Sequence, residues 1–387
     1  MTEPISRRAF AAGVAVLPLA AFGQRAAAPA GGEWIVHTDV PPNREVPLAD
    51  LIRKWITPVD RFYVRSHAAS PAVDADAYRL TVDGLVERPL SLSLAELSDR
   101  FESVKAVCTM TCAGNRRTEH SRTRQISGVP WQAGAIGNAA WGGVRLSDVL
   151  TAAGVREGAR HVWFDGLDEI ERPEGAIGFG ASIPVEKAMS EEAGLPGAVV
   201  CTTMNGEPLT ADHGFPVRTV VPGYIGARSV KWLGRIRVSD RPNPNHYQAT
   251  AYKVVTEATP IEWAEKAPIY RFPLNAVICT PAAGAGVAAG RVEVAGYALP
   301  PGEPGVRVGR VEVSGDGGAT WTKAALTGEQ RPMCWTLWKA SVPVEADARS
   351  LLVRATDTRG RGQPRTAPWN KKGYLYNGWH RVPVEAS

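Results

Sequence analysis

Hydrophobic and polar residues in the first two thirds of the chain follow a pattern typical of strands joined by short helices. Apolar and polar residues alternate over 78–86, which predicts a half-buried strand. More continuous apolar segments predict further strands over 104–110, 199–204, 217–222 and 230–238. The strand over 104–110 leads directly to Cys112.

Helices are predicted over 144–153 and 185–189, and Ser93 and Glu96 have the spacing of a capping box at the start of another. Residues 31–60 are rich in proline and predict an irregular arm. Because strands and helices do not alternate regularly, the pattern indicates an α+β domain, which we place over 31–258.

The pattern changes in the last third of the chain. Short segments of alternating polarity at 291–294, 310–314, 335–338 and 351–355 are separated by glycine-rich turns at 316–318 and 357–360. Strands at this spacing are typical of an immunoglobulin-like all-β sandwich. We therefore expect a second domain over 259–387, with dimerisation as its role.

The N-terminal segment, residues 1–30, has the features of an export signal. Arg7 and Arg8 precede an apolar stretch over 11–22 and an alanine-rich region. This order resembles a twin-arginine signal, the alternative being a basic disordered terminus. We expect export of the folded protein to the periplasm, and no later apolar run is long enough to span a membrane.

Charge and cysteine content exclude several functional classes. The net charge of +5 is mild, and no block of Lys and Arg with interleaved aromatic residues indicates a nucleic-acid groove. Five cysteines are an odd number, which argues against a complete disulfide framework in an exported protein. No Cys-x-x-Cys-His motif is present, so no covalently attached c-type haem is expected.

The segment Cys-Ala-Gly-Asn-Arg-Arg at 112–117 is the most informative motif. A thiolate is a ligand for soft or redox metals, and arginine pairs bind oxyanions through planar, bidentate hydrogen bonds. Taken alone, the motif also fits a buried cysteine followed by a turn and a solvated face. Three further loops carry cations that could join it, at 65–67, 213–218 and 226–231.

Taken in order, these motifs resemble the sulfite oxidase family of molybdopterin enzymes. The resemblance covers essentially the whole chain after the signal and rests on the motifs at 62–67, 112–117, 128–131, 204–209, 212–218, 222–234, 369–373 and 379–380. It implies a molybdopterin-binding α+β domain followed by an immunoglobulin-like dimerisation domain.

The resemblance also implies roles for individual residues. Cys112 would be the thiolate ligand of molybdenum, which one molybdopterin also holds. Tyr252 takes the position of the active-site tyrosine, because its spacing from Lys231 fits better than that of Tyr247. The residues expected in the oxyanion pocket are Arg65, Arg117, Trp131 and Lys372. Those expected to hold the pterin are Tyr63, Arg65, Ser66, His67, Asp148, His213, Arg218, Ser229 and Lys231.

Lys372 departs from the family pattern, in which many members carry arginine at this position of the Trp-Asn-x-x-Gly motif. Lysine keeps the charge but lacks the planar fork of a guanidinium. We expect weaker or less discriminating oxyanion binding, or compensation by Lys371.

The implied activity is the oxidation of sulfite to sulfate by oxo transfer at a mononuclear molybdenum centre. With no haem on the chain, electrons would pass singly to a separate acceptor, expected to be a c-type cytochrome. The alternatives are a sulfane dehydrogenase-type subunit of a sulfur-oxidation complex, an exported sulfoxide reductase and a non-catalytic exported binding protein. We expect a homodimer.

Overall fold

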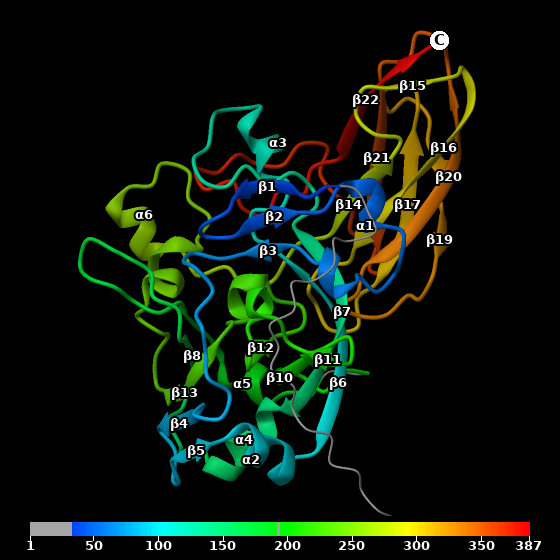
Figure 1. Ribbon diagram of the computed structural model, residues 1–387. Coiled ribbons are helices and arrows are strands. Elements are labelled where there is room, and N and C mark those ends of the chain that lie inside the picture. Colours follow the sequence, from blue (N-terminus) through cyan, green and yellow to red (C-terminus); the bar gives the residue numbers. More distant parts are fainter. Residues whose placement is uncertain (1–32, 192–193) are drawn as a thin grey trace, which may run out of the picture. The chain divides into compact units, whose positions relative to one another are not determined.

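The predicted site lies at the end of a five-stranded sheet (Figure 1). The computed structural model describes residues 33–191 and 194–387. The strands across this sheet are β11 (Glu207–Pro208), β10 (Val199–Met204), β7 (Ile136–Arg145) and β6 (Ser103–Thr111), and β12 (Arg218–Val220) pairs with β10. Strands β6 and β7 pair antiparallel from Ser103 opposite Val144 to Thr111 opposite Ile136. Cys112 therefore follows a strand that is anchored along its whole length.

A second sheet and three helices complete the core of this region. The strands, in order, are β5 (Leu90–Leu92), β4 (Leu80–Gly84), β13 (Leu233–Ser239), β8 (His161–Gly166) and β9 (Gly180–Pro184), and the helices are α2 (Leu94–Arg100), α4 (Leu146–Ala153) and α5 (Val185–Met189). The predicted capping box of Ser93 and Glu96 is present at α2. The helix predicted from residue 144 begins later, because Val144 and Arg145 extend β7.

The prediction of an irregular arm over 31–60 was wrong. This segment forms β1 (Ile35–Thr38), β2 (Asn43–Glu45) and the short helix α1 (Leu48–Leu51). Strand β2 pairs with β1 on one side and with β3 (Val64–Arg65) on the other. These strands are too short to show a hydrophobic period, so the partner strand, rather than the local sequence, determines their structure.

The last third of the chain is a two-sheet sandwich, as predicted. One sheet contains β14 (Asn275–Thr280), β16 (Gly290–Leu299), β20 (Thr336–Val344) and β19 (Ala325–Thr327), and the other contains β15 (Ala285–Val287), β22 (His380–Ala386), β21 (Ser350–Asp357), β17 (Val308–Ser314) and β18 (Thr322–Lys323). Residues of both sheets share one apolar core, to which Val294, Trp338, Val311 and Val353 contribute. The predicted α+β fold with a β-sandwich is therefore confirmed.

Contacts connect the two regions, so residues 31 to 387 form one unit. The guanidinium of Arg116 is fully buried and donates to Asn275 Oδ1 (2.6 Å) and to the Gly378 carbonyl (2.9 Å). The division at residues 258 and 259 stays a prediction. The predicted export signal lies outside the described residues. In the described part of the chain, no helix is long and apolar enough to cross a membrane.

Candidate active site

Cys112 is held by a tight turn directly after β6. Its amide donates to the Ala135 carbonyl (2.9 Å), and its carbonyl accepts from the Asn115 amide (3.0 Å). The Gly114 amide points at Cys112 Sγ across 3.4 Å. Only 9% of the residue is exposed. The amide orients the sulfur, and a cysteine binds metals through its thiolate form.

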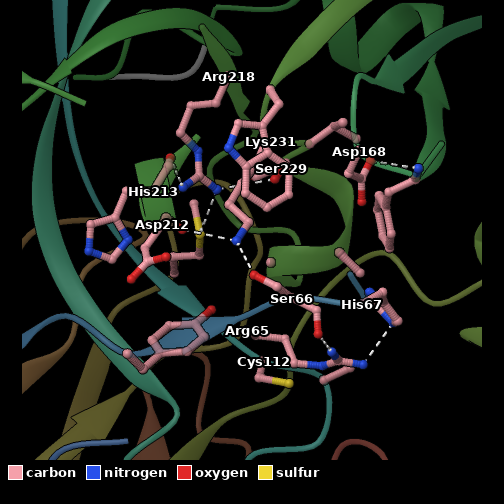
Figure 2. A pocket seen from close by; sticks show the side chains of 18 of the residues that line it. Arg65, Ser66, His67, Cys112, Asp168, Asp212, His213, Arg218, Ser229 and Lys231 are labelled. Carbon is pink, nitrogen blue, oxygen red and sulfur yellow. Dashed lines mark hydrogen bonds between the residues drawn. The ribbon is translucent and has the colours of Figure 1, made fainter. Parts of the chain in front are cut away.

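A cavity opens beside Cys112 (Figure 2). Ten of the predicted residues line it: Tyr63, Arg65, Ser66, His67, Cys112, His213, Arg218, Ser229, Lys231 and Tyr252. The structure thus brings together residues from five separate segments of the sequence.

Arg218 and His213 lie on the side of the cavity away from Cys112 (Figure 2). The guanidinium of Arg218 is buried and donates to the carbonyls of His213 (2.9 Å) and Ser229 (3.1 Å). Burial lowers the pKa of Arg218 to about 10, so it remains a cation at neutral pH. Burial and the charge of Arg218 lower the pKa of His213 to about 3, so its ring is neutral. This side of the cavity suits an anionic group.

Lys231 reaches into the same region from the loop before β13. Its ammonium donates to Ser66 Oγ (2.6 Å) and to the Asp212 carbonyl (2.9 Å). Burial, followed by the charge of Arg218, lowers the pKa of Lys231 to about 7. A bound phosphate would favour the charged form, because an opposite charge stabilises it.

This shift predicts a pH dependence for the cofactor-free protein. Unfolded Lys231 keeps its proton up to about pH 10.4, whereas folded Lys231 loses it through about pH 7. Between these values the unfolded state binds more protons, so stability rises with pH. We expect the melting temperature of cofactor-free wild type, compared with Lys231→Met, to rise from pH 7 to pH 10. A pH-independent difference would contradict the assignment.

Arg65, His67 and Tyr252 form a connected group beside Cys112. Arg65 Nη2 and His67 Nε2 are 2.7 Å apart, so the guanidinium donates to an unprotonated ring nitrogen. Burial, followed by the charges of Arg65 and Lys231, holds the pKa of His67 well below its usual value. The Tyr252 hydroxyl lies 3.4 Å from the same nitrogen, and burial raises the pKa of Tyr252. Tyr252 therefore keeps its proton and can donate it in a hydrogen bond.

Arg117 and Trp131 do not line this cavity but lie against the turn that holds Cys112. A methyl group on Gly114 would lie 2.6 Å from Arg117 Nη2 and 3.2 Å from Trp131 Cδ1, so glycine permits this close approach. Arg117 donates through Nε to the Lys372 carbonyl (3.0 Å) and through Nη1 to the Val129 carbonyl (2.8 Å). The remaining guanidinium nitrogen, Nη2, lies against the Cys112 turn.

The side chain of Lys372 lies apart from the cavity. Its ammonium is 5.6 Å from the centre of the Trp263 ring, and its backbone carbonyl, not its charge, contacts Arg117. Lys372 therefore holds Arg117 through its backbone carbonyl. Its ammonium does not lie with the other predicted pocket residues.

The assignment of Asp148 to the pterin site is corrected by the structure. Asp148 lies in the first turn of α4, its side chain is 38% exposed, and it faces Arg145 at 3.6 Å. The carboxylates that line the cavity are those of Asp168 and Asp212. Asp168 accepts from the Phe179 amide (2.9 Å), and Asp212 accepts from Arg44 (2.5 Å). Asp168 follows β8, and Asp212 lies in the single helical turn Ala211–His213. Asp148 instead lies on the partly exposed surface of α4.

Sequence reasoning also missed Tyr374. Its ring stacks on that of Tyr252 with centroids 5.3 Å apart, and the Arg117 guanidinium lies 5.3 Å from its centre. Tyr374 thus connects the two groups of predicted residues. Its position directly after the Trp-Asn-x-x-Gly motif was the available signal.

The residues present fit a molybdopterin. Cys112 offers a sulfur ligand at one side of the cavity, and Arg218 and Lys231 offer cations for a phosphate at the other (Figure 2). The Trp131 indole N–H is fully buried and has no hydrogen-bond partner in the described part of the chain. Within residues 33–191 and 194–387, no group of three or more His, Cys, Asp or Glu is arranged to hold a metal.

Comparison with known proteins agrees with this site. The family described as oxidoreductase molybdopterin binding domain matches residues 67–247, and the Mo-co oxidoreductase dimerisation domain matches residues 266–387. Sulfite oxidase of Gallus gallus is 42% identical over 359 residues, which are 89% of this chain and 76% of that protein. Sulfite oxidase of Arabidopsis thaliana is 36% identical over 371 residues, which are 90% and 92% of the two chains.

A solved structure is also similar. The sulfane dehydrogenase SoxCD from Paracoccus pantotrophus aligns with a TM-score of 0.75 and 27% identity, over 92% of this chain and 90% of that one. Fold, site and relatives lead to the same conclusion. The chain belongs to the sulfite oxidase family of molybdopterin enzymes and carries the family's dimerisation domain.

Proposed function

We propose that this protein oxidises sulfite to sulfate. The observation that carries the proposal is that Cys112 and Arg65 line a cavity with cations for a phosphate on its far side, while the Arg117 guanidinium lies against the turn that holds Cys112. Sulfite carries two negative charges on three oxygens. Two guanidiniums can hold these oxygens by charge-assisted hydrogen bonds and leave the sulfur free to react.

The residues of this chain bind and orient the substrate. When bound, the molybdenum cofactor supplies an oxygen-transferring centre that accepts two electrons. Overall, sulfite and water give sulfate, two electrons and two protons. Arg65 and Arg117 stabilise the anion while its charge redistributes. Tyr252, protonated and 3.4 Å from neutral His67, donates a hydrogen bond to the reacting group.

The two electrons must leave to a separate acceptor, and we propose a c-type cytochrome in the periplasm, with the chain exported through its twin-arginine signal. We further propose that two chains associate through the dimerisation domain. The test mixes the purified protein with sulfite and ferric cytochrome c. Cytochrome reduction that depends on sulfite, with formation of sulfate, is the expected result, and its absence with every acceptor tried would contradict the proposal.

The likeness to SoxCD favours one alternative, a sulfane dehydrogenase-type subunit acting on protein-bound sulfur. The same acceptor assay distinguishes the two, with a carrier protein bearing a persulfide in place of sulfite. Turnover only of the carrier-bound sulfur would support the alternative. A sulfoxide reductase is less well supported, because the sandwich domain is present, and a binding protein without metal would show neither activity.

Lys372→Arg should restore the guanidinium that the family pattern carries at this position. We expect the sulfite KM to fall by only a few fold, below the factor of roughly 10–100 that a fully formed charged hydrogen bond of about 1.5–3 kcal/mol gives, because the side chain at position 372 lies over Trp263 and apart from the cavity. Lys371→Arg, one residue away and exposed, is the matched control. A KM that rises in Lys372→Arg alone would show that lysine is favoured here.

A further inference from the structure

The strand β2 contacts both groups of predicted anion-binding residues. Asn43, at its start, lies opposite Arg65 in the pairing with β3. Its side-chain carbonyl accepts from Arg65 Nη1 and from the Ser66 amide, both at 3.2 Å. Its amide nitrogen is fixed in turn by the Thr38 hydroxyl at 2.8 Å. Asn43 is 2% exposed, so its own position is determined by these contacts.

Glu45, at the other end of β2, fixes the segment that follows Trp131. Its carboxylate is fully buried and accepts from the amides of Gln132 (2.8 Å) and Gly134 (2.7 Å). A methyl group on Gly134 would lie 3.0 Å from the Glu45 oxygen and 2.5 Å from the Val46 carbonyl, so the approach requires glycine. A buried carboxylate with two backbone donors holds that backbone in one geometry.

The same segment supports the turn of Cys112 and Arg117. The carbonyls of Trp131 and Gln132 accept from the amides of Thr118 (3.1 Å) and Arg116 (2.5 Å). His37 completes the arrangement, because its Nε2 lies 2.7 Å from Glu45 and its ring packs edge-on against Trp131 with centroids 4.9 Å apart. A displacement of Glu45 would therefore reach both Trp131 and the residues on either side of Arg117.

We propose that Asn43 and Glu45 are positioning residues of the oxyanion pocket: Asn43 orients the Arg65 guanidinium, and Glu45 holds the backbone that places Trp131 and Arg117. This inference rests on the proposed function for the identity of the substrate. Neither residue is among those that line the cavity, and we assign neither a contact with substrate. Their effect is on the affinity for a tetrahedral or pyramidal oxyanion.

The test compares holoenzymes of wild type, Asn43→Ala and Glu45→Gln. Glu45→Gln keeps the shape of the side chain but replaces one carboxylate oxygen by an NH₂ group. This NH₂ group cannot accept the hydrogen bond that a backbone amide of Gln132 or Gly134 donates in wild type. We expect the sulfite KM and the dissociation constant of sulfate, measured by titration calorimetry, to rise roughly tenfold in each variant, the effect of one charged hydrogen bond. Molybdenum and pterin content and kcat at saturating sulfite should stay within about twofold of wild type.

Asp39→Asn, an exposed carboxylate in the turn between β1 and β2, is the matched control and should leave all of these quantities unchanged. Fully loaded Asn43→Ala and Glu45→Gln proteins with the sulfate affinity of wild type would overturn the proposal. So would a loss of melting temperature and cofactor content with no change in sulfate affinity, since this indicates a structural role alone.

The sulfate titration separates this inference from the proposed function. If wild type binds sulfate but does not oxidise sulfite, the proposed function fails. The sulfate dissociation constants of the variants, compared with that of wild type, still test whether Asn43 and Glu45 position the pocket. If Glu45→Gln does not fold, Asn43→Ala and His37→Gln decide it by the same criterion, with His37→Gln expected to weaken sulfate binding through Trp131.

Discussion

Replacing Cys112 by serine is expected to abolish sulfite oxidation while the fold persists. Serine has the same shape, but its hydroxyl stays protonated at neutral pH and is a harder ligand than a thiolate. The loss should exceed the roughly 10–100-fold that follows removal of a side chain supporting a metal ligand, because the ligand itself is removed. The measurement is sulfite-dependent reduction of ferric cytochrome c, with molybdenum and pterin content determined on the same sample.

Cys334→Ser is the matched control for this prediction. Cys334 is fully buried, and its thiol donates to the Val107 carbonyl (3.2 Å), a contact that serine can keep. Burial raises the pKa of Cys334 to about 12, so this thiol remains protonated and unreactive. Activity that is lost equally in both variants would reflect damage to the core. Activity retained in Cys112→Ser would remove the assignment of Cys112 as the metal ligand.

The second large effect is expected from Arg117→Met, which removes the guanidinium that lies against the Cys112 turn. Two charge-assisted hydrogen bonds to the substrate are each worth about 1.5–3 kcal/mol, so kcat/KM should fall by a factor of roughly one hundred or more. Arg117→Lys should lose nearly as much, because an ammonium cannot span the two oxygens of the anion and the Val129 carbonyl together.

Arg122→Met, at the exposed end of the same short helix α3 (Arg117–Ser121), controls for the loss of a nearby charge. The Lys372 and Val129 carbonyls lose their donors in the Arg117 variants, so a modest fall in melting temperature is also expected. Sulfite turnover in Arg117→Met within about threefold of wild type would exclude Arg117 from the oxyanion pocket.

The local sequence was enough to predict those parts of the site in which neighbouring residues act together. The strand before Cys112, the turn after it and the cationic loops at 213–218 and 226–231 are each contained in a short segment. Their apolar periods and turn residues specify structure before any tertiary contact forms. The α+β region and the sandwich were predicted for the same reason.

Residues that depend on distant partners were not predictable in this way. Asp168 reaches the cavity only because β8 pairs with β13, whose preceding loop carries Lys231. Asp148 has an equally plausible local sequence, but its helix surface faces solvent. In the segment over 31–60, β2 formed by pairing with β3, and β1 by pairing with β2. Tyr374 contacts Tyr252 across more than a hundred residues, and the motif before Tyr374 marks its position but not its partner.

The central claim is that Cys112 belongs to a molybdenum centre, and elemental analysis of the purified wild-type protein tests it most directly. The account predicts one molybdenum per chain, with an equal amount of pterin, in preparations that oxidise sulfite. A folded protein that oxidises sulfite without molybdenum, or that contains none when produced in a host that supplies the cofactor, would contradict it.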